Sequence, residues 1–196
     1  MLAAHLVSQG DMVAVTLSGR LRRQRQTAEP LADALGGELA VDPRWDEYDT
    51  DDILAHHSSS SVRQARTPGN DAPHVSQREF QHVLETALLE WIAADGSGPA
   101  TESWAAFSAR VSAALGALER RLQPGQAAVV CTSGGVLAAL CTHLLGVAPE
   151  TLVSFNRVTV NAGITRVLLG RSGATLLSFN EQGHLLAADG SLVTYR

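Results

Sequence analysis

Residues 13–35 of the chain read VAVTLSGRLRRQRQTAEPLADAL. The segment Val13–Leu17 is a short apolar run of the kind that a buried strand carries. Ser18 and Gly19 interrupt this run, and a helical pattern follows, with residues recurring at three- and four-residue intervals at Leu21, Thr27, Ala28 and Leu31. A strand that passes through a small-residue corner into a helix places the first helical turn at the carboxyl edge of a sheet. Free backbone N–H groups and the helix dipole favour an anion at such a place.

Arginine side chains crowd this corner, at Arg20, Arg22, Arg23 and Arg25. A guanidinium group suits phosphate because its planar donors pair with two oxygens at once. A basic helix start that faces only solvent gives the same local pattern, so the pattern alone leaves both interpretations open.

A second corner of the same kind occurs later in the chain. Residues 127–131, AAVVC, form a continuous apolar run that is typical of a strand buried on both faces. Thr132-Ser133-Gly134-Gly135 follows, and then a helical segment that we expect at Val136–Leu145. Two such corners in one parallel sheet can converge on one ligand beyond the carboxyl ends of the strands.

The first corner resembles a known family. Residues 18–28, SGRLRRQRQTA, are similar to the second signature of the histidine phosphatase superfamily, the phosphoglycerate-mutase-like proteins. The resemblance implies that Arg23 binds the phosphate, that Thr27 supports it from the helix, and that Ser18 and Arg20 belong to the same phosphate-binding corner. It also implies an α/β fold, a three-layer α/β/α sandwich with a mostly parallel sheet.

The second corner departs from the family pattern. The family has a histidine where this chain has Ser133, and the resemblance implies that Ser133 and the Gly134 backbone hold the phosphate oxygens. A hydroxyl group donates a hydrogen bond but carries no positive charge, so stabilisation of the transition state should be weaker. One branch of the superfamily resembles this chain in having Thr-Ser-Gly-Gly at this corner. His184 is a candidate to supply the missing cation, and a surface or capping histidine is the alternative.

An acidic loop follows the predicted strand Glu38–Val41. Glu47 lies two residues after Trp45, where the resemblance implies the proton donor to the leaving oxygen. A carboxyl group is needed there because an alkoxide leaves poorly unless it is protonated. Aspartates surround this residue, and neighbouring negative charges favour the acid form of a carboxyl group. The alternative is an acidic loop that caps a helix over residues 51–57.

The first ten residues, MLAAHLVSQG, have Leu2, His5 and Leu6 on one helical face, with Gly10 in the usual place after a helix. Leu6–Gly10 could also be a decayed form of the family's opening Leu-Val-Arg-His-Gly. Gln9 and Arg23 are too close in sequence for that, because a whole helix separates the two motifs in the family. We therefore expect these residues to be the end of the family's first helix. On this hypothesis the strand with Arg-His-Gly, and its nucleophilic histidine, precede a truncated start.

The remaining pattern predicts long amphipathic helices at Gln77–Ala94 and Ser103–Leu122, with their tryptophans in the core. Strands at Val158–Leu169 and Ala174–Phe179 are predicted to form a hairpin at the sheet edge. Residues 58–75 are polar and rich in turn formers, which indicates a flexible loop or lid. We expect one domain over residues 1–196.

Composition limits the function classes. The formal charge of −5 argues against a general binder of polyanions, so we expect no nucleic-acid partner. Apolar runs are too short to span a membrane, and the two cysteines fit buried positions, so we expect a cytoplasmic protein without a membrane partner. His56 and His57 lack a third metal ligand at suitable spacing, and the family's chemistry requires neither metal nor cofactor. A homodimer is possible.

Two functions remain. The first is phosphatase-type hydrolysis of a small phosphomonoester through a phosphohistidine, impaired or absent in the chain as given. The second is a catalytically inactive module that binds a phosphorylated ligand or regulates through it. A mutase is less favoured than a phosphatase.

Overall fold

The computed structural model describes residues 1–57, 76–187 and 190–195. The chain divides into two compact units, one made of Met1–Glu47 with Arg110–Arg196 and the other of Tyr48–Ala109. The predicted loop or lid at residues 58–75 lies outside the described residues. Both predicted corners belong to the first unit, which we describe first.

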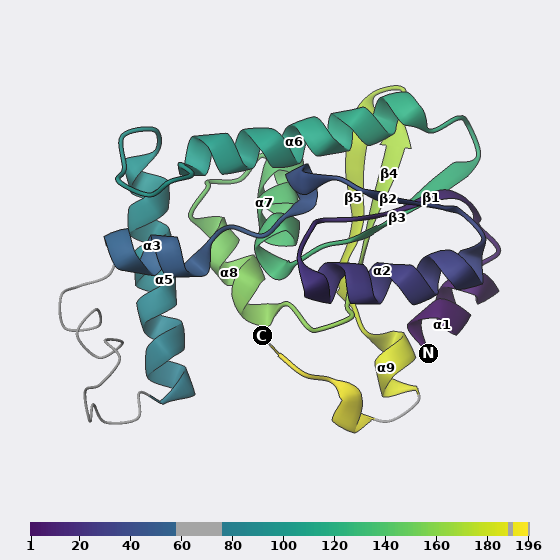
Figure 1. Ribbon diagram of the computed structural model, residues 1–196, viewed down its shortest axis with the longest axis horizontal. Coiled ribbons are helices and arrows are strands. Elements are labelled where there is room, and N and C mark those ends of the chain that lie inside the picture. Colours follow the sequence, from purple (N-terminus) through teal and green to yellow (C-terminus); the bar gives the residue numbers. More distant parts are fainter. Residues whose placement is uncertain (58–75, 188–189, 196) are drawn as a thin grey trace. The chain divides into compact units, whose positions relative to one another are not determined.

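A parallel sheet positions both corners (Figure 1). Strand β1 (Met12–Ser18) lies between β2 (Glu38–Val41) and β3 (Gln126–Cys131), and all three run in the same direction. Ser18, the last residue of β1, is in register with Val41 and with Cys131, the last residues of its neighbours. The three strands therefore end at one edge of the sheet, and the loops that follow them start side by side.

Helices cover both faces of this sheet. Helix α2 (Arg22–Leu35) packs Ala28 and Leu31 against Cys131 of β3. Helix α1 (Leu2–Ser8) adds apolar side chains to this cluster. The part of α6 (Trp104–Arg121) that belongs to this unit crosses the other side of the sheet (Figure 1), where Arg121 pairs with Glu38 of β2 at 2.7 Å. The layers are helix, sheet and helix, which confirms the predicted α/β class with a parallel sheet.

Helix α7 begins earlier than its apolar pattern predicts. It spans Gly134–Leu145, with Ser133 as the residue that precedes its first turn. The glycine pair is thus the first helical turn and not a loop before it. Its backbone N–H groups are among the four that have no partner within a helix.

The segment after α7 corrects a prediction. Helix α8 spans Thr151–Val158 and packs on α7, and strand β4 covers Ile164–Gly170, so the strand predicted from Val158 is wrong in its first half. Buried residues of α8 recur at Leu152, Val153 and Asn156, a helical spacing. Only Val158 of the predicted strand belongs to α8, and residues 159–163 contain a turn in which the Gly163 N–H donates to the carbonyl oxygen of Val160 at 3.0 Å.

The terminal hairpin forms with the predicted turn. Strand β5 (Gly173–Glu181) pairs antiparallel with β4, and Gly170 is opposite Gly173. Among the described residues the two strands form a sheet of their own, so their predicted place at the edge of the parallel sheet is wrong. Strand β5 packs against α7, and the hairpin pairs its backbone groups internally. Helix α9 (Gly183–Leu186) follows.

The second unit is helical. Helix α3 (Thr50–His57) packs on α5 (Gln77–Ala94), and the first residues of α6 complete the unit. Its core is an aromatic cluster with ring centroids 5.5–6.0 Å apart, made of Tyr48, Trp91, Trp104 and Phe107. The tryptophans of these helices are buried, as predicted.

Candidate functional site

The side-chain amide of Gln24 joins the two strand-to-helix corners. Its Nε2 donates a hydrogen bond to Ser133 Oγ at 2.9 Å and another to the carbonyl oxygen of Trp45 at 3.1 Å. Its Oε1 accepts a hydrogen bond from the backbone N–H of Leu21 at 3.3 Å. Gln24 is only 2% exposed, and hydrogen bonds shielded from water are electrostatically strong. The starts of α2 and α7 are therefore held next to each other.

The loop after β2 brings one carboxylate to each corner. Asp46 accepts hydrogen bonds from the backbone N–H of Arg20 at 2.5 Å and from its Nε at 2.7 Å. Glu47 Oε2 accepts a hydrogen bond from the backbone N–H of Gly135 at 3.1 Å. Helix N-termini favour negative groups because their N–H groups lack partners in the helix. Donors at both corners are thus placed for anionic oxygens.

Buried contacts fix this loop in position. The carbonyl oxygen of Trp45 also accepts a hydrogen bond from Thr132 Oγ1 at 2.7 Å. Arg110 of α6 donates through Nη1 to the carbonyl oxygens of Asp46 at 2.7 Å and Arg44 at 2.9 Å. Trp45 itself is 2% exposed. The two carboxylates therefore extend from a backbone that is anchored on both sides.

Gly19 leaves the room that this network occupies. A Cβ atom at this residue would overlap Gln24 Oε1 and would lie 2.7 Å from Asp46 Oδ1 and 2.8 Å from the carbonyl oxygen of Trp45. All three atoms take part in hydrogen bonds of the site. The small residue at the first corner is needed for the close approach of its neighbours.

Four predicted site residues come together in this network. Ser133 precedes the first turn of α7, Gly134 is the first residue of that turn, and Glu47 reaches the adjoining Gly135. Arg20 joins them through Asp46. Ser133 and Glu47 are each 8% exposed, so both side chains are largely shielded from solvent.

Two other predicted residues lie differently. Ser18 is fully buried, and its carbonyl oxygen accepts a hydrogen bond from the backbone N–H of Asp42 at 2.9 Å. Arg23 is exposed, and its guanidinium makes no ion pair within the described residues. Its carbonyl oxygen accepts a hydrogen bond from Thr27 Oγ1 at 3.0 Å. The backbone of Arg23 adjoins Gln24, but no hydrogen bond joins its side chain to Ser133.

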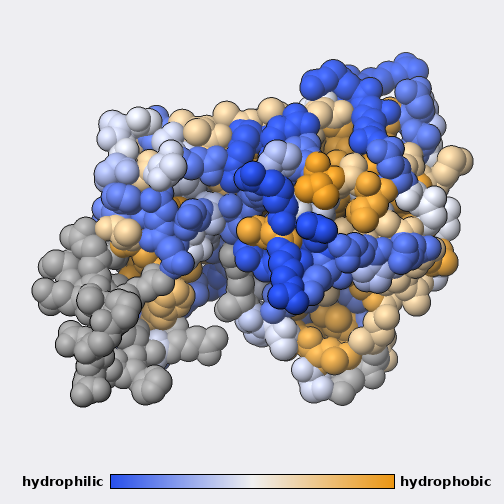
Figure 2. Space-filling model, in the orientation of Figure 1, coloured by the Kyte–Doolittle hydropathy of each residue, from blue (hydrophilic) through white to orange (hydrophobic). Residues whose placement is uncertain are grey.

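Positively charged side chains lie at the start of α2, which is the positive end of the helix dipole. Its first turn holds no acidic residue, and Arg22 and Arg23 are its first two residues. Each cation at a helix N-terminus is unfavourable by roughly 0.3–1 kcal/mol when no anion compensates it. Hydrophilic side chains cover the outward surface of α2 (Figure 2). An anion bound at this corner would relieve the repulsion.

His184 lies in another part of the first unit. Its ring stacks on that of His5 in α1, with centroids 5.3 Å apart. Burial lowers the pKa of His184, and the positive charge of His5 lowers it further. A neutral imidazole is therefore favoured here, and the ring that it stacks on belongs to α1 and to neither corner.

The sequence contained a signal for Gln24 that we did not use. Gln24, Ala28 and Leu31 occupy one face of α2 and are all buried. A polar residue within a buried helical face needs hydrogen-bond partners, so its position alone indicated a polar network. For Arg110 and Asp46 no such pattern exists, because their partners lie in distant segments of the chain.

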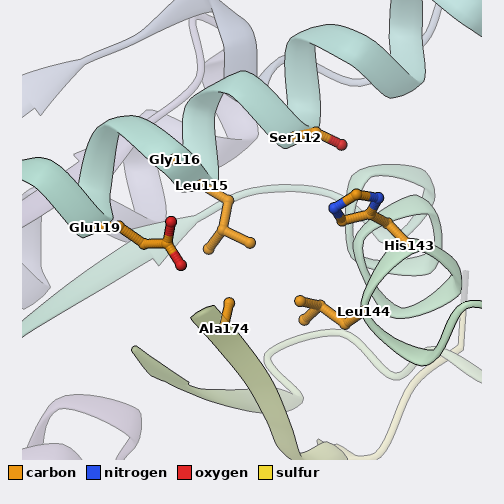
Figure 3. Close-up of a pocket in the computed structure, with 7 residues that line it drawn as sticks. All are labelled: Ser112, Leu115, Gly116, Glu119, His143, Leu144 and Ala174. Carbon is orange, nitrogen blue, oxygen red and sulfur yellow. The ribbon is translucent and has the colours of Figure 1, made fainter. Parts of the chain in front are cut away.

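A separate pocket lies at the other end of α7 (Figure 3). Its volume is about 240 Å³, and residues of α6, the end of α7 and the start of β5 line it. Glu119, Ser112 and His143 contribute its polar groups. Helix α7 has 12 residues, and a rise of about 1.5 Å per residue separates its ends by about 18 Å. The pocket is therefore distinct from the Ser133 corner.

With this geometry in place, comparison with known proteins identifies the class. The family model of the histidine phosphatase superfamily (branch 1) matches residues 1–81 and 69–182. The chain belongs to this superfamily, and the resemblance at residues 18–28 is confirmed at the level of the family. A search of proteins with curated functions found no match.

Solved structures with the same fold include phosphatases. The chain is 21% identical to a mycobacterial glucosyl-3-phosphoglycerate phosphatase solved with VO3, with a TM-score of 0.58 over 92% of this chain and 82% of that one. It is 19% identical to a phosphoserine phosphatase variant from Entamoeba histolytica in complex with phosphoserine, with a TM-score of 0.61 over 94% and 81%. Bacillus stearothermophilus YhfR is 15% identical, with a TM-score of 0.64 over 94% and 81%. These likenesses establish the shared fold.

Two further observations concern the described residues alone. Within residues 1–57, 76–187 and 190–195, no group of three or more His, Cys, Asp or Glu side chains is arranged to hold a metal ion. None of the helices in this part of the chain combines the length and apolar character needed to cross a membrane.

Proposed function

We propose that the corner formed by Ser133, Gly134, Arg20 and Arg23 binds the phosphoryl group of a small phosphomonoester. The main support is the contact of Gln24 with Ser133, which joins the starts of α2 and α7 into one site for an anion. Backbone donors at this site already bind the carboxylates of Asp46 and Glu47. Arg23, one residue before Gln24, is free to turn its guanidinium toward a bound phosphate.

Glu47 is the proposed general acid. Its carboxyl group lies at the first turn of α7, next to Ser133, where a leaving oxygen could take its proton as the P–O bond breaks. The neighbouring proteins of this fold that are named as phosphatases support the same reaction class for this chain.

The rate of hydrolysis depends on whether a nucleophilic histidine is present. Hydrolysis through a phosphohistidine needs a histidine beside the phosphorus atom, and no Arg-His-Gly triplet occurs in the sequence. Ser133 supplies a hydrogen bond but no positive charge at its corner. We therefore infer that these 196 residues bind a phosphorylated ligand and hydrolyse it weakly or not at all.

Calorimetric titration with inorganic phosphate and with vanadate tests binding. We expect the wild-type chain to bind both, and Arg23→Gln to bind about tenfold or more weakly, because a hydrogen bond to a charged group contributes about 1.5–3 kcal/mol. Arg171→Gln, at an exposed position of the hairpin turn, is the matched control and should bind as the wild type does. Failure of the wild type to bind either anion would overturn the proposal.

Hydrolysis of p-nitrophenyl phosphate tests turnover. The chain should show little or none, and a protein that includes any in-frame residues preceding Met1 in the source genome should be assayed beside it. Glu47-dependent hydrolysis in the longer protein would favour the enzyme. Phosphate binding without hydrolysis in both would favour the inactive binding or regulatory module.

A further inference from the structure

We infer that Gln24 is a positioning residue that holds the hydroxyl of Ser133 as a hydrogen-bond donor toward the bound ligand. This inference rests on the proposed function of the Ser133 corner. It assigns a role to a buried side chain that does not itself touch the ligand.

The orientation of the Gln24 amide follows from its partners. The carbonyl oxygen of Trp45 can only accept, so the atom that faces it at 3.1 Å must be the NH₂ nitrogen. The backbone N–H of Leu21 can only donate, so the atom that faces it must be the amide oxygen. Each partner independently excludes the flipped amide, and the assignment does not depend on Ser133.

The same nitrogen faces Ser133 Oγ at 2.9 Å. Its two hydrogens are then used by the Trp45 carbonyl and by Ser133, and an NH₂ group has no capacity to accept. Ser133 must therefore accept from Gln24, and its own O–H hydrogen points elsewhere. Because a lone pair of the Ser133 oxygen already accepts from Gln24, the hydroxyl hydrogen is left to donate to a different acceptor.

This arrangement selects the chemistry of the ligand. Ser133 is the residue before the first turn of α7, whose backbone N–H groups are also donors, that of Gly135 to Glu47. A ligand atom there meets donors from both the backbone and the hydroxyl, so it must be an oxygen that only accepts, as in a phosphoryl group. Without Gln24 the hydroxyl would be free to rotate and donate within the protein.

A double-mutant cycle on inorganic phosphate binding tests the inference. Ser133→Ala should weaken binding about tenfold, because it removes one hydrogen bond to an anion. Gln24→Met, which keeps the length of the side chain but has no donor, should weaken it by a similar factor. The double variant should bind no more weakly than Ser133→Ala alone, because Gln24 acts through the hydroxyl. Gln26→Met, exposed on the same helix, is the control and should leave the affinity unchanged.

The free energy of unfolding, measured on the same proteins, shows how much each substitution destabilises the fold. If Gln24 only stabilises the fold, the effects of the two substitutions on phosphate affinity should add. Additive effects would overturn the inference. If Gln24→Met does not fold, Gln24→Glu replaces it in the same cycle. A carboxylate cannot donate to Ser133, and its negative charge repels phosphate whether or not the Ser133 hydroxyl is present. Gln24→Glu should therefore weaken phosphate binding more in the wild type than in Ser133→Ala, and an equal effect in both would overturn the inference.

Failure of this inference and failure of the proposed function are distinguishable. If the wild type binds phosphate and the effects add, only the role of Gln24 is wrong. If the wild type does not bind phosphate or vanadate, both the corner's function and the role of Gln24 are wrong.

Discussion

Glu47 Oε2 accepts a hydrogen bond from the backbone N–H of Gly135 at 3.1 Å, so the acidic loop after β2 supplies a carboxylate to the first turn of α7. These two residues are far apart in sequence, one in the loop that follows β2 and the other in the first turn of α7. Their contact places a carboxyl group and the N-terminus of α7 in one small region.

Replacing Glu47 tests its proposed role as a proton donor and the effect of its negative charge on phosphate binding. Glu47→Gln keeps a side-chain oxygen for Gly135 but removes a negative charge from the corner. We expect phosphate to bind several-fold more tightly, because a like charge near the anion is lost, while any hydrolysis falls. Calorimetry with phosphate measures the first effect. Glu29→Gln, on the exposed surface of α2, is the control, and weaker binding by Glu47→Gln would contradict the prediction.

Asp46→Asn addresses the first corner. The asparagine oxygen can still accept from the Arg20 backbone, but the ion pair with Arg20 is lost. Arg20 is 70% exposed, so the loss of stability should be at most about 1 kcal/mol. Arg20 is then free to turn to a phosphate, and binding should tighten at low salt. Titration at two salt concentrations checks this, and tightening that does not diminish with salt would speak against an electrostatic origin.

Gly19→Ala should disrupt the network. The added methyl group overlaps Gln24 and approaches Asp46 and Trp45, all of which are held by hydrogen bonds. Strain of this kind typically costs about 1–3 kcal/mol. We expect a lower midpoint of urea unfolding together with weaker phosphate binding. Gly96→Ala, where an added methyl group meets open space, should change neither quantity.

Both cysteines should resist modification in the folded protein. Burial raises the pKa of Cys131 to about 12 and that of Cys141 to about 11. The reactive thiolate is therefore scarce at pH 8, and access is blocked as well. Ellman's reagent should release colour only after denaturant is added. Rapid reaction of the native protein would show that the end of β3 or the middle of α7 opens readily.

Stability should fall as the pH drops through about 6.5. Burial lowers the pKa of both His57 and His184 below 6.5, so the unfolded chain binds protons that the folded chain does not. Stability then rises with pH around this value and is lost as the pH falls through about 6.5. Urea unfolding at several pH values measures the slope. His57→Gln and His184→Gln should each make stability depend less on pH. An unchanged slope in both variants would contradict the role of these two histidines.

Much of the first unit could be predicted from sequence. The apolar runs at residues 13–17 and 127–131, each followed by small residues and a helical period, determine two strand-to-helix corners. Parallel strands then bring those corners to one edge of a sheet. The positions of Thr27, Ala28 and Leu31 along α2 also follow from its helical period, which begins after the break at Ser18 and Gly19.

Only the tertiary structure decided what meets at the corners. The hydrogen bonds of Gln24 with Ser133 and of Glu47 with Gly135 join segments whose separation in sequence carries no periodic signal. The same holds for His184, whose neighbour is His5 of α1. Local sequence fixes backbone conformation and which face is apolar, because both depend on near neighbours. Polar contacts between distant loops depend on how the layers pack, and that packing is determined by the whole chain at once.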